Sequence, residues 1–135
     1  MIVVDTNVIA YFWLPDPMTI ASVRLLEHDA AWAAPLLWRS EFRNLLVGAV
    51  RSRAISADQA EELSGHAEAH MTGREYAVNS SHVLALALRS GCSAYDCEFV
   101  ALAERLGATL VTNDRAVLRA FPGIATPLAA FASNG

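Results

Sequence analysis

The sequence contains no lysine, so all ten of its basic residues are arginines. Fourteen acidic residues outnumber them and give a formal net charge of −4. Proteins that bind nucleic acid through phosphate contacts alone are normally basic, so this balance argues against simple electrostatic clamping. Two bound divalent cations would bring the net charge to zero. The balance is therefore compatible with a nucleic-acid enzyme that binds metal, although it does not favour one.

Cysteine and long apolar runs are also scarce. Only Cys92 and Cys97 are present, and their spacing indicates neither a metal knuckle nor a disulfide framework. The apolar runs are short and have charges nearby, so we expect no membrane-spanning helix. The first residues lack the basic region and the long apolar run of a signal peptide, which favours a cytoplasmic location. No Gly-rich phosphate loop occurs, which argues against nucleotide-driven chemistry.

The pattern of short apolar segments alternating with helical stretches runs through the whole chain. Its 135 residues, 54% of them hydrophobic, are enough for one core, and we predict a single domain over residues 1–135 with a loose tail over 129–135. The predicted strands cover residues 2–4, 32–34, 76–78, 108–112 and 124–126. The predicted helices cover residues 19–29, 36–53, 57–71, 81–89, 94–106 and a short stretch after Asp114. This alternation predicts an α/β domain with a mainly parallel sheet.

Short polar side chains mark the expected starts of several helices. Ser56 and Ser93 are predicted N-caps, because a serine hydroxyl can accept a hydrogen bond from a free backbone N–H of the first turn. The helix that ends at Gly91 has two candidate caps, Ser80 and Ser81. These residues set the expected helix boundaries.

Two aspartates come shortly after predicted strands. Asp5 directly follows the strand at 2–4, and Asp114 follows the strand at 108–112. The carboxyl ends of parallel strands meet at one edge of a sheet, so we expect both side chains on the same rim. Each also has a simpler explanation, because an aspartate at such a place often caps the following helix.

Glu41 interrupts the apolar face of a predicted helix. Leu37 and Leu45 lie four residues on either side of it, on the same face. An ionised carboxylate in such a place is costly unless it is paired or binds a cation. An ion pair with Arg39 or Arg43 is the alternative to cation binding.

Asp96 lies three residues after Ser93, a spacing that is also typical of a capping pair. Together with Asp5, Glu41 and Asp114 it makes a set of four acids, here called the acidic quartet. Hard cations such as Mg²⁺ prefer oxygen ligands, and clustered carboxylates need a cation to remain ionised together. Such a site suits phosphodiester hydrolysis, because bound cations activate water and neutralise charge on the phosphate.

Four segments of the chain carry a resemblance to a known family. They are Val3-Val4-Asp5-Thr6-Asn7, Arg39-Ser40-Glu41-Phe42-Arg43-Asn44, Ser93-Ala94-Tyr95-Asp96 running into Val100-Ala101-Leu102-Ala103, and Leu110-Val111-Thr112-Asn113-Asp114-Arg115. Each is weak by itself, but four in this order are specific. They resemble the PIN-domain ribonucleases, most closely the small VapC-type toxins of bacterial toxin–antitoxin pairs.

The resemblance implies a three-layer α/β/α fold, a Mg²⁺ or Mn²⁺ cofactor and endonuclease action on structured RNA. It implies that the acidic quartet binds the metal and is catalytic. Thr6 and Asn7 match polar supports for Asp5, and Thr112 matches a hydroxyl that assists Asp114. None of the four acids departs from the family pattern.

The resemblance also implies protein partners. One is a second copy of the chain, giving a homodimer, and the other is a cognate antitoxin whose tail blocks the metal site in a hetero-oligomer. The candidate contacts are Trp13, Leu14, Trp38, Phe42 and Leu46, for which ordinary core packing is the alternative explanation.

Candidate substrate contacts are arginines near the acids. Arg115 lies beside Asp114, and Arg43 lies near Glu41, so both are candidates for holding RNA phosphates. No histidine accompanies the acids, which disfavours a ribonuclease mechanism based on histidine acid–base catalysis.

Two other functions remain open at this point. One is a PIN-like module that no longer cuts and only binds RNA or protein, against which the intact acidic quartet argues. The other is a phosphatase-like hydrolase, against which the lack of an Asp-x-Asp motif near the first strand argues. The sequence therefore predicts a metal-dependent endoribonuclease that acts as a toxin.

Overall fold

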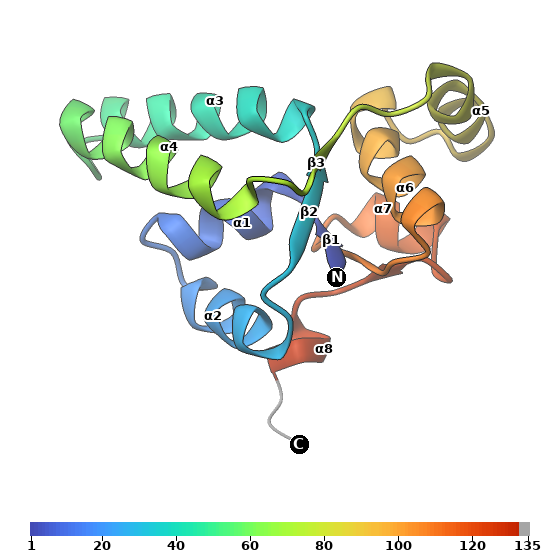
Figure 1. The fold of residues 1–135 in the computed structure, drawn as a ribbon, viewed down its shortest axis with the longest axis horizontal. Helices are drawn as coiled ribbons and strands as arrows, with labels where there is room; N and C mark the ends of the chain where they lie inside the picture. The colour runs from blue at the N-terminus through green and yellow to red at the C-terminus, as the bar shows by residue number, and fades with distance from the viewer. Residues whose placement is uncertain (133–135) are drawn as a thin grey trace.

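A computed structural model describes residues 1–132 and shows a five-stranded, entirely parallel sheet with helices on both sides (Figure 1). The strands are β1 (Ile2–Val4), β2 (Trp32–Pro35), β3 (Glu75–Tyr76), β4 (Leu110–Val111) and β5 (Ala125–Thr126). Their order across the sheet is β3-β2-β1-β4-β5, with β5 at an edge. The prediction of an α/β domain with a parallel sheet is confirmed.

The described helices form the two outer layers. They are α1 (Thr6–Trp13), α2 (Thr19–His28), α3 (Leu37–Arg51), α4 (Ala57–Met71), α5 (Ser80–Ser90), α6 (Ala94–Leu106), α7 (Arg115–Ala120) and α8 (Ala129–Ala132). Helices α1 to α4 lie on one side of the sheet and α5 to α7 on the other, while α8 packs against α2 (Figure 1). The three-layer α/β/α arrangement is thus as predicted. Among the described residues, no helix is both long and apolar enough to cross a bilayer.

Strand β1 occupies the centre of the sheet. Val3 pairs with Ala33 of β2 on one side and with Leu110 of β4 on the other. The chain first builds the sheet outward from β1 through β2 to β3, then returns to place β4 on the free side of β1. The carboxyl ends of β1 and β4 therefore flank the point where the strand order reverses, which is where α/β sheets form their binding crevices.

Burial in the core makes several of the candidate partner contacts unavailable to partners. Trp38, Phe42 and Leu46 are at most 4% exposed and belong to the core on one face of α3. The prediction that these three contact an antitoxin is therefore wrong, and the alternative of core packing holds. Trp13 and Leu14 are half-buried and pack against the core.

Helix α1 is an element that the sequence patterns do not predict. Its segment is rich in β-branched and aromatic residues, which have modest intrinsic helix propensity. Burial of Val8, Ile9 and Ala10 overrides that propensity, because only the helical conformation places these three side chains in the core. Asp5 thus stands at a strand-to-helix junction, without a loop between the two elements.

Two further expectations need correction. The cap of α5 is Asn79, whose side chain accepts a hydrogen bond from the backbone N–H of His82, and neither Ser80 nor Ser81 fills that role. The tail expected to be loose from Ala129 begins instead with α8, and residues 133–135 lie outside the described residues.

The other caps are as predicted. Ser56 begins α4 with a capping box that includes Gln59, and Ser93 accepts a hydrogen bond at the start of α6. Gly91 ends α5 with a φ of 76°, a left-handed conformation that glycine adopts without steric cost.

The short strands have boundaries that differ from the predicted ones. The structure begins β3 at Glu75, one residue earlier than predicted, and confines β4 to Leu110 and Val111. Thr112 therefore lies just beyond the end of β4, beside the carboxyl end of β1.

Candidate functional site

The acidic quartet lines one cavity at the carboxyl ends of β1 and β4. This acid cavity has a volume of about 220 Å³, and its other walls come from four residues: Thr6, Asn7, Asn44 and Leu45. Asp5 precedes α1, Glu41 lies in α3, Asp96 in the first turn of α6, and Asp114 directly before α7. Four segments that are far apart in the sequence thus supply one carboxylate each, and the switch point of the sheet brings them together.

Thr112 links the first and the last acid. Its hydroxyl Oγ1 donates a hydrogen bond to Oδ2 of Asp5 at 2.8 Å and accepts one from the backbone N–H of Asp114 at 3.0 Å. The threonine is 1% exposed. A buried hydroxyl with both a donor and an acceptor role is held in one orientation, so it fixes the Asp5 carboxylate relative to the backbone of Asp114.

Thr6 has the same relation to Glu41. Its Oγ1 donates a hydrogen bond to Oε1 of Glu41 at 2.7 Å, although the two residues are 35 positions apart. The resemblance implied Thr6 as a support for Asp5, and a hydrogen bond from the Thr6 backbone does act to lower the pKa of Asp5, while the Thr6 hydroxyl joins the carboxylate on α3. The adjacent Asn7 is exposed and lines the acid cavity.

Arg39 does not pair with Glu41. Its guanidinium binds Glu75, with Nε at 2.6 Å from Oε1, and also contacts Glu68 at 2.9 Å. The indole N–H of Trp38 donates to the same oxygen of Glu75 at 2.7 Å. The ion pair with Arg39 that could have explained Glu41 is therefore absent, and Arg39 serves to tie α3 to β3 and α4.

Of the capping roles considered for the acids, that of Asp114 is present, Asp5 makes no side-chain cap hydrogen bond, and Ser93 caps α6 through the N–H of Asp96. The hydroxyl of Ser93 accepts a hydrogen bond from the backbone N–H of Asp96 at 3.0 Å, and Oδ1 of Asp114 accepts one from the N–H of Val117 at 3.0 Å. Capping and cavity lining do not compete, because a helix N-terminus orients an acid while its positive end favours the ionised form. The Asp114 cap orients its carboxylate, and the Ser93 cap fixes the backbone of Asp96 at the cavity.

Burial and mutual repulsion perturb three of the four acids. Burial raises the pKa of Asp5, Glu41 and Asp96 above the usual range. The charge of Asp96 raises the pKa of Asp5 and Glu41 further, while the threonine hydrogen bonds act in the opposite direction. For Asp96, the neighbouring charge of Asp114 adds to the effect of burial. Such crowding stores electrostatic energy that a cation can relieve.

The donor set of the acid cavity is made of oxygen ligands. Carboxylates are joined by the amide side chains of Asn7 and Asn44, and no histidine or cysteine lines it. Oxygen donors of this kind fit a hard cation such as Mg²⁺ or Mn²⁺ and not Zn²⁺ held by nitrogen or sulfur. As the side chains stand in the described part of the chain, no three acidic, histidine or cysteine side chains converge closely enough to hold an ion.

Neither predicted substrate arginine lines the acid cavity. Arg115 is exposed at the first position of α7, next to Asp114. Arg43 is also exposed but lines a different hollow of about 430 Å³ between α3 and α4. Arg43 follows Glu41 by two residues, so the helical turn of about 100° per residue directs it away from the acids.

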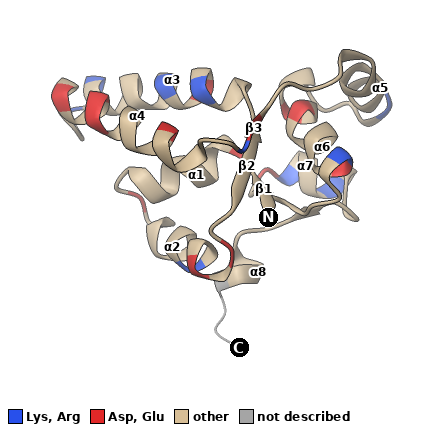
Figure 2. Cartoon of the chain, viewed as in Figure 1, with Lys and Arg blue, Asp and Glu red and all other residues tan. Residues whose placement is uncertain are grey.

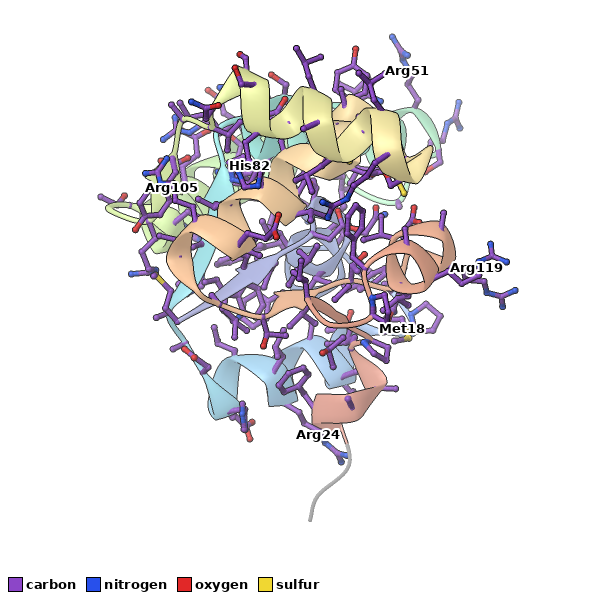
Figure 3. All side chains as sticks on the ribbon, turned by 90° about the vertical axis from the view of Figure 1, so that its right-hand side faces the viewer. Met18, Arg24, Arg51, His82, Arg105 and Arg119 are labelled. Atoms are coloured by element: carbon purple, nitrogen blue, oxygen red, sulfur yellow. The ribbon has the colours of Figure 1, made fainter. Side chains whose placement is uncertain are left out.

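Other arginines add positive charge around the molecule. Arg51 of α3 and Arg119 of α7 extend into solvent from the same side (Figure 3). Helix α3 carries arginines, whereas α4 carries acids and no arginine (Figure 2). The contact between Arg39 and Glu68 shows that charges of opposite sign meet between α3 and α4. This side of the molecule is therefore not a uniformly basic surface.

Two residues near the acid cavity carry signals that the sequence reasoning did not use. Asn44 follows Glu41 by three residues, which places both on one face of α3 and provides the signal for its position in the cavity. Glu98 is half-buried, burial raises its pKa, and its charge raises the pKa of Glu41. His66 and His70 lie elsewhere, packed against Trp13 and Trp32.

Comparison with known proteins finds both sequence and structural relatives. The PIN domain is the family whose profile matches, over residues 2–122. Ribonuclease VapC3 from Pyrobaculum aerophilum is 32% identical over 130 residues, which cover 93% of this chain and 98% of that protein. The relative therefore matches across nearly its whole length.

Solved structures share the fold at lower identity. PAE2754 from Pyrobaculum aerophilum superposes with a TM-score of 0.75 at 21% identity, covering 96% of this chain and 92% of that one. FitAcB from Neisseria gonorrhoeae gives a TM-score of 0.71 at 18% identity, covering 96% and 99%. A toxin-antitoxin complex from Klebsiella pneumoniae gives 0.69 at 17% identity, covering 95% and 98%.

Proposed function

This chain belongs to the PIN-domain family, and from that premise we propose that it is a divalent-metal-dependent endoribonuclease acting as the toxin of a toxin–antitoxin pair. The observation that carries the proposal is the convergence of the acidic quartet in one cavity at the switch point of the sheet. The similarity to a protein named a ribonuclease, across nearly the whole length of both chains, supports RNA as the substrate.

The acidic quartet is the proposed holder of Mg²⁺ or Mn²⁺. Its oxygens fit hard cations, and binding would remove the repulsion that raises the pKa of Asp5 and Asp96. When bound, such cations supply Lewis acidity and charge neutralisation for phosphodiester hydrolysis. Capture requires the acidic side chains to converge further than they do in the arrangement described above.

The protein's own contribution is orientation. Thr112 and Thr6 each hold one oxygen of a carboxylate, that of Asp5 and that of Glu41, through hydrogen bonds of 2.8 and 2.7 Å. Both hydroxyls are buried, so these carboxylates do not rely on solvent to set their direction. Oriented carboxylates lose less conformational freedom on binding a cation, which favours affinity.

The substrate proposed is structured RNA, cut inside the chain. The acid cavity is open to a phosphate group, and Arg115 next to Asp114 provides an exposed cation beside it. A net charge of −4 disfavours tight electrostatic binding of any RNA. Selection is therefore expected to come from RNA shape and unpaired positions more than from overall charge.

The test is cleavage of a labelled stem-loop RNA by the purified protein with Mg²⁺, with Mn²⁺ and with a chelator. We expect cleavage with either metal, none with chelator, and none with Asp5→Asn or Asp96→Asn. Glu62→Gln on the exposed face of α4 is the matched control and should cut normally. Wild-type cleavage by folded Asp5→Asn and Asp96→Asn would contradict the proposal.

An alternative function, a PIN module that binds RNA or protein without cutting, is tested by metal titration. Calorimetry should detect Mn²⁺ binding to the wild type and a large loss of affinity in Asp96→Asn. A wild type that binds no metal and cuts no RNA would favour the alternative. The three clustered acids with raised pKa are the arrangement expected of a metal-binding site, which metal titration tests directly.

The proposed partners are a cognate antitoxin and a second copy of the chain. One structural relative is described as a toxin-antitoxin complex, which supports an antitoxin partner here. Exposed apolar side chains provide contact surface, among them Leu84 and Leu88 of α5, which are 56% and 85% exposed. Co-expression with a short open reading frame found next to this gene, followed by light scattering, should yield a complex that no longer cuts RNA.

A further inference from the structure

A second cavity adjoins the acid cavity and has no role in the function proposed so far. It has a volume of about 210 Å³ and shares two wall residues, Asn7 and Leu45, with the acid cavity. Its own walls include Tyr11 of α1 and Ala49 of α3, so we call it the tyrosine cavity. The shared residues make the two cavities neighbours.

The aromatic wall of the tyrosine cavity is held in place by the turn that follows α1. Thr19 Oγ1 lies within hydrogen-bond distance of two backbone carbonyls, that of Tyr11 at 2.7 Å and that of Leu14 at 3.2 Å. These contacts fix the end of α1 against the start of α2. Tyr11 is half-buried and lines the cavity.

The hydroxyl of Tyr11 remains a donor at neutral pH. Burial raises its pKa, the charge of Asp16 raises it further, and a hydrogen bond with Asn113 opposes the change. The charge of Asp5 also raises the pKa of Tyr11, in keeping with the wall residues that the two cavities share. A group bound against Tyr11 would therefore lie next to the acid cavity.

The charge of the tyrosine cavity selects against phosphate. Its walls contain the carboxylate of Asp16 and no arginine or histidine. One oxygen of Asp16 accepts a hydrogen bond from the backbone N–H of Met18 at 2.8 Å, which orients the carboxylate. A carboxylate accepts hydrogen bonds and repels anions, so the suitable occupant is a neutral group that carries N–H donors.

The size and the walls of the cavity match a single flat ring system. Its volume of about 210 Å³ lies below the range of about 300–1,000 Å³ typical of drug-sized ligands, so it holds one ring and no larger fragment. Apolar side chains such as Leu14 and Ala49 offer contacts to the edge or face of a bound ring, and Tyr11 adds an aromatic contact. Proteins read unpaired RNA bases by stacking of this kind combined with polar contacts at the base edge.

We propose that the tyrosine cavity binds one unpaired nucleobase of the RNA, adjacent to the phosphodiester that lies over the acidic quartet. Tyr11 contacts the base, and Asp16 accepts a hydrogen bond from its exocyclic amino group. Adenine, cytosine and guanine carry such a group, whereas uracil offers only its ring N3–H, so bases with an amino group are preferred. This inference rests on the proposed ribonuclease function, whose substrate selection it describes.

The first experiment does not depend on cleavage. Adenosine and uridine are titrated into the isotopically labelled protein in the presence of chelator, and backbone amide shifts are followed by NMR. We expect adenosine to shift the amides of Tyr11 and Ala49, uridine to act at least several-fold more weakly, and Ala49→Leu to remove the response by filling the cavity. Ala69→Leu, the same change on the exposed face of α4, is the matched control and should respond like the wild type.

The second experiment measures cleavage kinetics of a stem-loop RNA with each base at the positions flanking the cut. Tyr11→Ala and Ala49→Leu should raise KM about tenfold, leave kcat nearly unchanged and flatten the base preference. Asp16→Asn should narrow the difference between amino-bearing bases and uracil. If either Tyr11→Ala or Ala49→Leu has a lowered melting temperature, the other of these two variants is compared with the wild type.

The outcomes separate this inference from the proposed function. If the wild type cuts no RNA, the proposed function fails, and the nucleoside titration still decides whether the cavity binds a base. If it cuts RNA but folded Tyr11→Ala and Ala49→Leu keep the wild-type KM and base preference, the inference is overturned. Equal shifts by adenosine and uridine would overturn the assignment of Asp16, and the absence of any shift at Tyr11 would overturn the subsite itself.

Discussion

Thr112 and Asp5 are 107 residues apart in the sequence, and the hydroxyl of Thr112 donates a hydrogen bond of 2.8 Å to the Asp5 carboxylate. The contact spans the two central strands, since Asp5 follows β1 and Thr112 follows β4. The sheet register therefore sets the position of one acid directly. A shift of β4 by one residue would turn Thr112 away and leave Asp5 without its partner.

Thr112→Val is expected to lower both stability and activity. It leaves the Asp114 N–H without its acceptor and Asp5 without its donor, in a place that is 1% exposed. Loss of buried partners of this kind costs about 1–3 kcal/mol of unfolding free energy. Urea unfolding measures the cost, and RNA cleavage should fall about tenfold or more in the folded variant. Thr109→Val, at the opposite end of β4, is the control, and an equal loss of activity there would contradict the positioning role.

Asp96→Asn is expected to stabilise the metal-free protein while weakening metal binding. Burial and the charge of Asp114 raise the pKa of Asp96, so its ionisation at neutral pH opposes folding. A neutral isostere removes that repulsion, and the melting temperature in chelator should rise by about 2–5 °C. Added Mn²⁺ should then raise the wild-type melting temperature more than that of the variant. A lower melting temperature of the variant in chelator would show that the carboxylate is structural.

The pH dependence of stability is expected to have two slopes of opposite sign. For Asp5, Glu41 and Asp96 the folded-state pKa is raised, so the native state holds more protons than the unfolded state between the ordinary and the raised values. Their contribution to stability is therefore lost as pH rises through that window. For Glu75, the hydrogen bond from Arg39 lowers the pKa, so its contribution is lost as pH falls.

Urea unfolding in chelator, from about pH 3 to about pH 8, separates the two contributions. Asp96→Asn should reduce the loss of stability as pH rises, and Glu75→Gln should reduce the loss of stability as pH falls. Saturating Mn²⁺ should abolish the rising-side loss in the wild type, because it pairs with the ionised acids. If Mn²⁺ leaves the loss of stability with rising pH unchanged, these pKa shifts are unrelated to metal binding.

The positions of Asp5 and Asp114 follow from the sequence because they depend on strand ends. Asp5 and Asp114 each follow an apolar segment that the alternation with helices marks as a strand of a parallel sheet. Because the carboxyl ends of parallel strands share one edge, the sheet brings both acids to one rim. Glu41 is found by helical periodicity, since its spacing from Leu37 and Leu45 marks the face that packs inward. These are local signals, and they hold regardless of the rest of the fold.

The walls of the cavities do not follow from such signals. Helix α1 forms because Val8 and Ile9 are buried by the remainder of the core, and this is a tertiary effect that overrides local propensity. Without α1, neither the partnership of Thr6 with Glu41 nor the place of Tyr11 beside the acids can be derived. The pairing of Arg39 with Glu75 likewise depends on where β3 lies.

Arg115→Ala is expected to weaken RNA binding without harming the fold. The residue is exposed at the first position of α7, where a positive charge opposes the helix dipole, so its removal should raise the melting temperature slightly. An exposed arginine beside Asp114 suits a phosphate contact. KM should rise several-fold, and the slope of log KM against log salt should fall by about one phosphate contact.

Arg43→Ala provides the contrast, because Arg43 lines the hollow between α3 and α4, away from the acid cavity. It should leave KM and the salt slope near their wild-type values. Equal effects of the two substitutions would show that RNA also crosses α3, and no effect of either would show that neither arginine contacts the RNA phosphates. The salt slope discriminates because it counts displaced counterions, which a change in helix stability does not alter.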